Sequence, residues 1–181
     1  MEPQSFTIKS RNGIQRVLTT GVGIALPSGN STSAPTNVQP FQAIWDTGAT
    51  GSVITAGVVQ KLQLKPIGKI TVNTAGGAHI QNQYLVDIIL PNDVGIRNVK
   101  VTEATLAGCD VLIGMDIITL GDLSITNHDD HTIMSFRIPS CHVIDYVTED
   151  HGAQEHRLKE SPQRAPLNRA ERRRLQQTGH L

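Results

Sequence analysis

The sequence predicts an all-β domain built from about ten short strands and at most two short helices. Apolar residues make up 38% of the 181 residues and aromatic residues only 3%. Valine, isoleucine, leucine and alanine must therefore fill the core, which favours strands over a helical bundle. Short runs of β-forming residues recur along the chain, with turn residues between them. We expect one domain over residues 1–148, followed by a polar linker and an Arg-rich tail over residues 149–181.

The first part of the chain is predicted to form a hairpin, a long loop and a strand. Residues 6–8 and 14–26 are rich in β-forming residues, and the Asn12-Gly13 turn between them predicts that they pair with each other. Residues 27–37 are polar and contain two prolines, which indicates a loop. Its length is typical of an insertion or a functional loop. A short strand over residues 42–45 then leads into the segment 46–49.

The middle and the end of the domain continue the β pattern. Residues 52–55 predict a strand, and residues 56–64 predict about two helical turns. Residues 69–73 and 79–90 predict a second hairpin, whose tip at Ala75-Gly76-Gly77 is glycine-rich. Strands over 98–103 and 110–114, one short helix over 115–120, and a last hairpin from 123–126 and 132–138 complete the domain.

Charge is unevenly distributed over the two predicted parts. Residues 1–148 hold 9 Lys/Arg and 11 Asp/Glu, a net charge of −2, whereas residues 149–181 hold 7 and 5, a net charge of +2. The main body has no broad basic surface, so nucleic-acid binding is not expected there. In the tail, Asn168 and Glu171 have the spacing of a helix N-cap pair, and a short Arg-rich helix could follow. The tail is otherwise expected to be solvated, and its arginines are a candidate contact for an acidic partner.

The sequence predicts neither a metal site nor a cofactor. His128 to His131 resembles a metal-binding run, but it is interpreted as a solvated turn because no further ligand stands at a suitable spacing. Cys109 and Cys141 allow one disulfide and fit a reducing compartment equally well. The first fifteen residues lack a secretory signal, and the longest apolar stretch, 17–26, is too short and too broken to span a bilayer. We expect a soluble, cytoplasmic protein with no membrane contact.

The most informative segment runs from the apolar strand 43–45 into Asp46-Thr47-Gly48-Ala49. The strand delivers a carboxylate at its end, the threonine hydroxyl can lock the turn, and glycine allows close backbone approach. Asp-Thr-Gly recurs by chance, so the motif alone is compatible with a strand-end turn in an unrelated β-protein.

Two further features follow in order. A hairpin with the tip 74–77 comes next, and the apolar segment 111–118 then contains Ile113-Gly114-Met115-Asp116. With the Asp-Thr-Gly motif, this order resembles the retropepsins, the single-lobed aspartic proteases of retroviral type, over roughly residues 5–140. The resemblance is greatest to bacterial members, across residues 112–139. It implies a closed β-barrel, corresponding to one half of an acid protease, with a flap hairpin.

What the resemblance implies is specific. Such proteins are homodimers that cleave polypeptide substrates, and each subunit would supply one Asp46 carboxylate to activate a shared water. Thr47 would lock the two loops across the dimer axis, Gly48 would line the substrate cleft, and Ala49 would belong to the same active-site loop. Residues of the hairpin tip would form the flap over the substrate: Thr74, Ala75, Gly76 and Gly77. Residues of the second motif would support the site, with Asp116 bonding backbone amides rather than acting in catalysis: Ile113, Gly114 and Asp116.

The sequence also departs from the retropepsin pattern. Position 50 is Thr50, where many retroviral members carry aspartate, so one ion pair that supports some dimers is missing. A monomeric enzyme of the pepsin type needs a second Asp-Thr-Gly motif. Asp93-Val94-Gly95 matches its first and third residues but lacks the threonine. We interpret that segment as a turn.

Two other functions are left open by the sequence. A retropepsin-fold dimer could bind peptides or partners in the same cleft with little turnover. An accessory protein could act through the Arg-rich tail, with the β-domain only dimerising. The intact Asp-Thr-Gly motif favours the peptidase.

Overall fold

The computed structural model describes residues 2–29, 33–74 and 77–151, and residues 1–141 form one compact unit. The strands in the described residues are β1 (Gln4–Lys9), β2 (Leu18–Ala25), β3 (Gln39–Trp45), β4 (Val53–Ile54), β5 (Gly68–Thr74), β6 (Gly77–Leu90), β7 (Val94–Glu103), β8 (Val111–Ile113), β9 (Asp122–His128) and β10 (His131–Ile138). The helices of this unit are α1 (Ala56–Leu62), α2 (Met115–Ile118) and the 3₁₀ turn η1 (Pro91–Asp93). The predicted all-β class is therefore confirmed.

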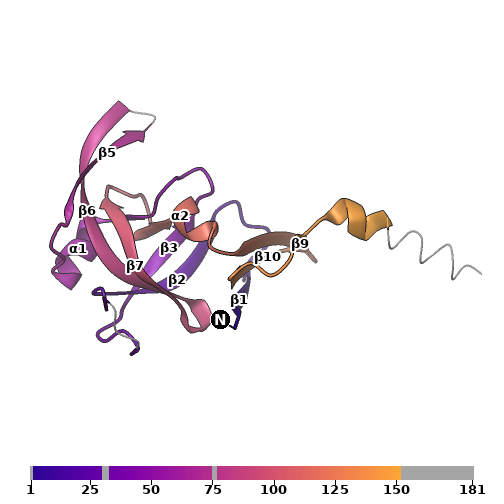
Figure 1. The fold of residues 1–181 in the computed structure, drawn as a ribbon. Coiled ribbons are helices and arrows are strands. Elements are labelled where there is room, and N and C mark those ends of the chain that lie inside the picture. The colour runs from indigo at the N-terminus through magenta and orange to yellow at the C-terminus, as the bar shows by residue number, and fades with distance from the viewer. Residues whose placement is uncertain (1, 30–32, 75–76, 152–181) are drawn as a thin grey trace, which may run out of the picture. The chain divides into compact units, whose positions relative to one another are not determined.

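Six strands close into a barrel. Their order is β2-β3-β8-β4-β7-β6, and β6 pairs again with β2, so the ring has no free edge. β5 pairs with β6 beyond this ring and extends from it as the upper hairpin in Figure 1. Alternate residues of the barrel strands fill its interior, including the fully buried Ile24, Ile88 and Val101.

The second predicted hairpin is confirmed. β5 and β6 pair from Gly68 opposite Gln83 to Thr74 opposite Gly77. Gly77 has a φ of +112°, a conformation that favours glycine. Ala75 and Gly76 lie outside the described residues.

The predicted hairpin between residues 6–8 and 14–26 is wrong. β1 pairs with β10, at the opposite end of the domain, while β2 starts only at Leu18 and pairs with β3 and β6. The turn at Gly13 does form, with a φ of +62° and its carbonyl accepting a 2.6 Å hydrogen bond from Ser10 Oγ. This turn lies within a loop over residues 10–17 and does not join two paired strands, because β1 buries its apolar face elsewhere in the domain.

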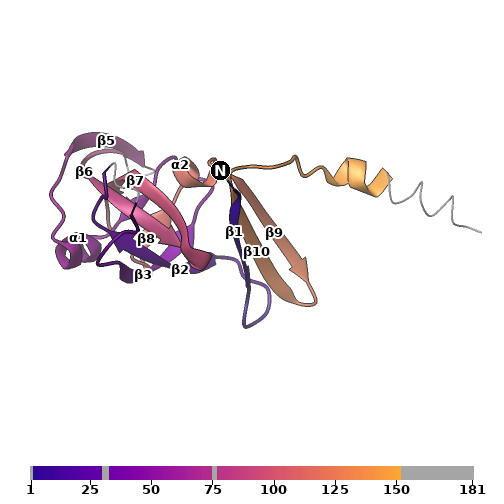
Figure 2. The same ribbon diagram turned by 60° about the horizontal axis from the view of Figure 1, so that its bottom comes forward.

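That face packs in an aromatic cluster at the end of the core. The ring of Phe6 lies 6.0 Å from that of Trp45 and 6.1 Å from that of Phe136, and the last two rings are 5.3 Å apart. The Trp45 indole N–H donates to Thr20 Oγ1 at 3.0 Å. Figure 2 shows the resulting sheet of β1, β10 and β9 beside the barrel. The cluster fixes the end of β3, directly before Asp46.

A carboxylate ties the last hairpin to the end of the compact unit. Asp122 accepts hydrogen bonds from Arg137 and from the Cys141 backbone N–H. The hydrogen bond from the Ser140 side chain, followed by those from Arg137 and Cys141, lowers the pKa of Asp122 to about 2. A side chain at Gly121 would meet the Arg137 carbonyl oxygen at 1.8 Å, so the turn before β9 requires glycine.

This low pKa predicts an acid-sensitive contribution to stability. An unfolded aspartate has a pKa of about 3.9, so the Asp122 contribution is complete above about pH 4 and is lost as the pH falls toward about 2. We expect Asp122→Asn to lower the urea midpoint at about pH 5 and to differ less from wild type at about pH 2.5. An equal difference at both pH values would contradict this role.

The second unit begins at His142 and is described through residue 151. Residues 146–151 are helical, which was not predicted. Asp145 caps this helix by accepting hydrogen bonds from the backbone N–H groups of Val147 and Thr148, at 3.0 and 3.3 Å. The predicted boundary at residue 148 stays a prediction, and the predicted N-cap at Asn168 lies outside the described residues. No helix in the described part is long and apolar enough to cross a membrane.

Candidate active site

Asp46 stands at the carboxyl end of β3, where β8 joins the two sides of its loop. β8 runs parallel to β3 and antiparallel to β4, so it lies between the strands that enter and leave the loop 46–52. The Asp46 backbone N–H continues the β3–β8 ladder by donating to the Ile113 carbonyl at 3.0 Å. The aspartate is half-buried, and its backbone position is set by the barrel.

The carboxylate of Asp46 is oriented by its own turn. The Gly48 backbone N–H donates to Asp46 Oδ1 at 2.8 Å, and the Ala49 N–H donates to the Asp46 carbonyl at 3.2 Å. A β-carbon at Gly48 would lie 3.1 Å from Oδ1, so glycine lets the amide reach the carboxylate. Within the described part of the chain, no side chain bonds to this carboxylate. Among the described residues, the other oxygen, Oδ2, accepts no hydrogen bond.

The loop is bonded to the start of α2 along its length. Met115 N–H donates to the Ala49 carbonyl at 2.8 Å, and Asp116 N–H donates to the Thr50 carbonyl at 3.2 Å. These bonds satisfy amides in the first turn of α2, which have no partner within the helix. The helix and the aspartate-bearing loop therefore hold one another.

A buried serine completes this connection. Ser52 is 1% exposed. Its hydroxyl donates to Asp116 Oδ1 at 2.8 Å and accepts from the Gly114 N–H at 3.1 Å. The predicted backbone contacts of Asp116 are present, with N–H groups of Ser52 and Ile117 each donating to it at 3.0 Å. Asp116 thus supports the site by bonding to the loop that carries Asp46, and it makes no direct contact with the Asp46 carboxylate among the described hydrogen bonds.

Gly114 is required where the two segments cross. A β-carbon there would lie 2.7 Å from both the carbonyl carbon and oxygen of Gly51, and 3.0 Å from the Ala49 oxygen. Side chains do not approach backbone atoms this closely, so only glycine allows β8 to pass under the loop.

Removing the Ser52 hydroxyl is expected to destabilise the domain. Ser52→Ala leaves the buried Gly114 N–H without a partner and deletes one bond to Asp116, which should lower the unfolding free energy by about 1–3 kcal/mol. Chemical denaturation measures this change. Thr50→Ala is the matched control, because its side chain is exposed on the same loop and makes no hydrogen bond to described residues. Equal effects of the two substitutions would contradict the role given to Ser52.

The predicted site residues fall into two groups in space. The loop and the second motif lie together: Asp46, Thr47, Gly48, Ala49, Ile113, Gly114 and Asp116. Thr47 and Gly48 are exposed, whereas Ile113 and Gly114 are buried beneath them. Thr74 and Gly77 end the two strands of the β5–β6 hairpin, while Ala75 and Gly76 lie outside the described residues. Ser52 was missed, since a lone serine after a glycine carries no local sign that it bonds to a helix residue 64 positions later.

The described residues contain no group of three or more His, Cys, Asp or Glu side chains that could hold a metal ion. His128 and Asp129 form an exposed pair at 3.4 Å on the β9–β10 turn. Cys109 is half-buried, and burial, followed by the charge of Asp110, raises the pKa of its thiol. A raised thiol pKa disfavours the thiolate, which gives no support to a nucleophilic role.

Comparison with known proteins identifies a family. Residues 33–119 match the family model described as gag-polyprotein putative aspartyl protease. This segment contains Asp46, Gly114 and the β5–β6 hairpin. No curated protein sequence matches the chain.

Solved structures with a similar fold include three proteases or protease-like domains. One is a retropepsin-like aspartic protease from Rickettsia conorii, with 14% identity, coverage of 76% of this chain and 95% of that chain, and a TM-score of 0.46. Another is the EIAV protease in complex with the inhibitor HBY-793, with 22% identity, coverage of 57% of this chain and 86% of that chain, and a TM-score of 0.43. The third is the retroviral protease-like domain of Ddi1 from Leishmania major, with 13% identity, coverage of 70% of this chain and 97% of that chain, and a TM-score of 0.37. The family match confirms the resemblance stated from the motifs: residues 33–119 are similar to the gag-polyprotein putative aspartyl proteases.

Proposed function

We propose that the protein is an aspartic endopeptidase that hydrolyses peptide bonds in polypeptide chains, with one Asp46 from each of two identical subunits. The observation that carries this proposal is the Asp46 carboxylate at the end of β3, held by the Gly48 amide inside the segment that matches the family. The rigid support from β8 and α2 is what a preorganised catalytic group needs.

Two subunits are required by the chemistry. The full sequence contains Asp-Thr-Gly once. Water-mediated hydrolysis of an amide needs a base for the water and an acid for the carbonyl oxygen at the same time. Two carboxylates about 3 Å apart, as known for aspartic proteases, share one proton because both cannot ionise at that distance. A symmetric dimer places one such group on each side of its axis.

The reaction then proceeds without a covalent enzyme intermediate. The ionised Asp46 takes a proton from the water as its oxygen bonds to the scissile carbonyl carbon, and the protonated Asp46 of the other subunit gives its proton to the carbonyl oxygen. The resulting tetrahedral diol collapses when the amide nitrogen takes a proton from the dyad and the C–N bond breaks. One hydroxyl of the diol returns its proton to the dyad as its C=O bond re-forms, so that a carboxylic acid and an amine leave and the dyad again holds one proton.

The β5–β6 hairpin is the natural cover for an extended peptide. Among the described strands β5 pairs only with β6, so its outer edge carries unpaired backbone groups. An extended substrate can bond to such an edge through its own backbone while side chains enter neighbouring pockets. We propose that closure of this flap excludes water from the bound peptide.

Cleavage of an unstructured protein substrate tests the proposal. Because the dyad titrates as a pair, the rate of cleavage should be bell-shaped across about pH 4 to 7. Pepstatin, an inhibitor of aspartic proteases, should abolish it. No cleavage at any pH by a preparation shown to be dimeric would support the peptide-binding module instead.

A further inference from the structure

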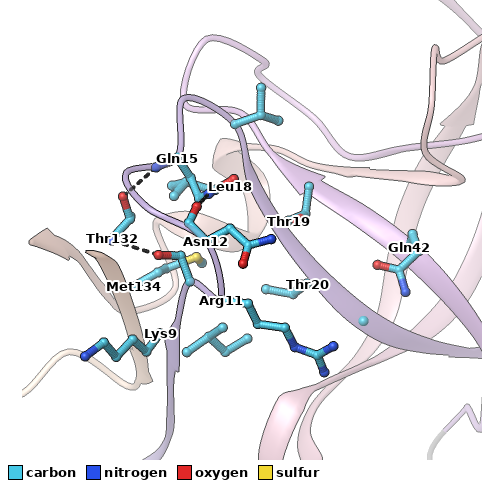
Figure 3. Close-up of a pocket in the computed structure, with 14 residues that line it drawn as sticks. Lys9, Arg11, Asn12, Gln15, Leu18, Thr19, Thr20, Gln42, Thr132 and Met134 are labelled. Atoms are coloured by element: carbon cyan, nitrogen blue, oxygen red, sulfur yellow. Dashed lines mark hydrogen bonds between the residues drawn. The ribbon is translucent and has the colours of Figure 1, made fainter. Parts of the chain in front are cut away.

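The structure contains a pocket that the proposed peptidase reaction does not use. It has a volume of about 560 Å³ and lies between the loop 10–17, strand β2 and the ends of β1 and β10. None of the residues 46–49 lines it, although two of its lining residues, Leu18 and Thr20, contact Trp45 directly before Asp46. Figure 3 shows the residues around it.

The wall of this pocket is held in place by internal hydrogen bonds. The Thr132 N–H donates to Ser10 Oγ at 3.0 Å, and the Gln15 N–H donates to Thr132 Oγ1 at 2.8 Å. Ser10 N–H also donates to the Thr132 carbonyl at 2.8 Å, continuing the β1–β10 ladder. The loop 10–17 is therefore tied to β10 at its base, which gives the pocket a defined shape.

A guanidinium group without a partner enters this space. The Arg11 side chain reaches from the loop toward Thr20 and Gln42, whereas the ammonium of Lys9 points the other way (Figure 3). In the described part of the chain, Arg11 makes no hydrogen bond or ion pair, and no acidic side chain lines the pocket. The nearby Asp110 carboxylate already accepts from the Gln42 backbone N–H at 3.0 Å. All five donors of Arg11 are available to a ligand.

Neutral donors and an apolar surface complete the pocket. The side-chain amides of Asn12 and Gln42 face it and make no hydrogen bond to other described residues. Leu18 and Met134 contribute apolar surface, with Met134 only 3% exposed. The pocket thus combines one cation, two amides and an aliphatic wall.

We propose that this pocket binds a carboxylate group of a peptide together with the aliphatic side chain next to it. A planar guanidinium pairs with a carboxylate through two parallel hydrogen bonds, and the amides can orient the adjoining backbone. The carboxylate can come from an acidic side chain or from a peptide C-terminus. Because none of the residues 46–49 lines the pocket, it would hold substrate or product chains of the proposed peptidase without taking part in the chemistry.

Binding of labelled peptides to the Asp46→Asn protein tests this site independently of cleavage. The probes are fluorescein-Gly-Gly-Leu-Glu-amide, its Gln-amide counterpart, and fluorescein-Gly-Gly-Leu with a free or an amidated C-terminus. Fluorescence anisotropy should show that at least one carboxylate-bearing probe binds, at least about tenfold more tightly than its neutral partner. Which acidic probe binds distinguishes a side chain from a C-terminus.

Substitutions of the loop arginines provide the controls. Arg11→Gln should weaken binding of the acidic probe about tenfold or more, and Arg11→Lys should restore only part of it because lysine lacks the planar pair of donors. Arg16→Gln removes an exposed arginine of the same loop that does not line the pocket, and it should bind like the parent protein. Equal binding of acidic and neutral probes, equal effects of Arg11→Gln and Arg16→Gln, or no binding at millimolar probe would overturn the proposal. None of these outcomes bears on catalysis by Asp46.

Discussion

Asp46→Asn is expected to abolish peptidase activity while leaving the fold intact. Asparagine keeps an oxygen that can accept the Gly48 N–H but can neither take nor give the catalytic proton. Loss of acid–base catalysis alone should lower kcat by about 10²–10⁴-fold. The measurement is cleavage of an unstructured protein by wild type and variant at the pH of maximal activity, with thermal unfolding of both as a check on folding.

A matched control is available in the same domain. Asp93 begins another Asp-x-Gly segment in the same compact unit, and it lies in the turn η1 with a left-handed φ of +56°. Asp93→Asn should retain full activity, since asparagine tolerates that backbone conformation as well as aspartate does. Loss of activity in Asp93→Asn, with retention in Asp46→Asn, would reverse the assignment of the catalytic aspartate.

Gly114→Ala is expected to cause the largest loss of stability among single substitutions near the site. The added methyl would lie 2.7 Å from two backbone atoms of Gly51, and neither segment can move without breaking the bonds to Ala49 and Ser52. Overpacking of this kind costs about 1–3 kcal/mol, and more where the neighbour is backbone. Because Gly51 belongs to the Asp46 loop, activity should fall with stability.

Gly51→Ala tests whether the contact itself is responsible. A β-carbon at Gly51 meets no heavy atom within 4 Å, although this residue forms the other side of the same crossing. Denaturant unfolding should therefore give a near-normal midpoint for Gly51→Ala and a much lower one for Gly114→Ala. Similar midpoints for the two variants would show that the close approach is not what requires glycine.

Much of the fold follows from local patterns in the sequence. Three elements were predicted near their observed bounds: the β5–β6 hairpin, helix α1 and the β9–β10 hairpin. Each is specified by the pattern of apolar and turn residues within a segment of about 20 residues. The Asp-Thr-Gly turn and the Gly114 segment were predicted together through their resemblance to the motifs of the retropepsins, and the structure places each glycine in a close approach to neighbouring atoms.

Non-local pairing was not predictable in this way. The Asn12-Gly13 dipeptide correctly predicts a turn, but a turn alone does not determine which strand pairs with β1. β1 pairs with β10, far away in the sequence, where Phe6 packs against Phe136. Ser52 was missed for the same reason, since its partners Asp116 and Gly114 become neighbours only when β8 inserts between β3 and β4.

The central claim is that one active site needs two copies of Asp46, and a mixed-dimer titration tests it most directly. Wild-type protein at fixed concentration is mixed with increasing Asp46→Asn protein under conditions that allow subunits to exchange. If each site uses both carboxylates, mixed dimers are inactive, and an equal amount of variant should lower the activity to about one half, with a threefold excess lowering it to about one quarter. Activity that stays constant as the variant is added would mean that each chain acts alone, and it would contradict the two-subunit site.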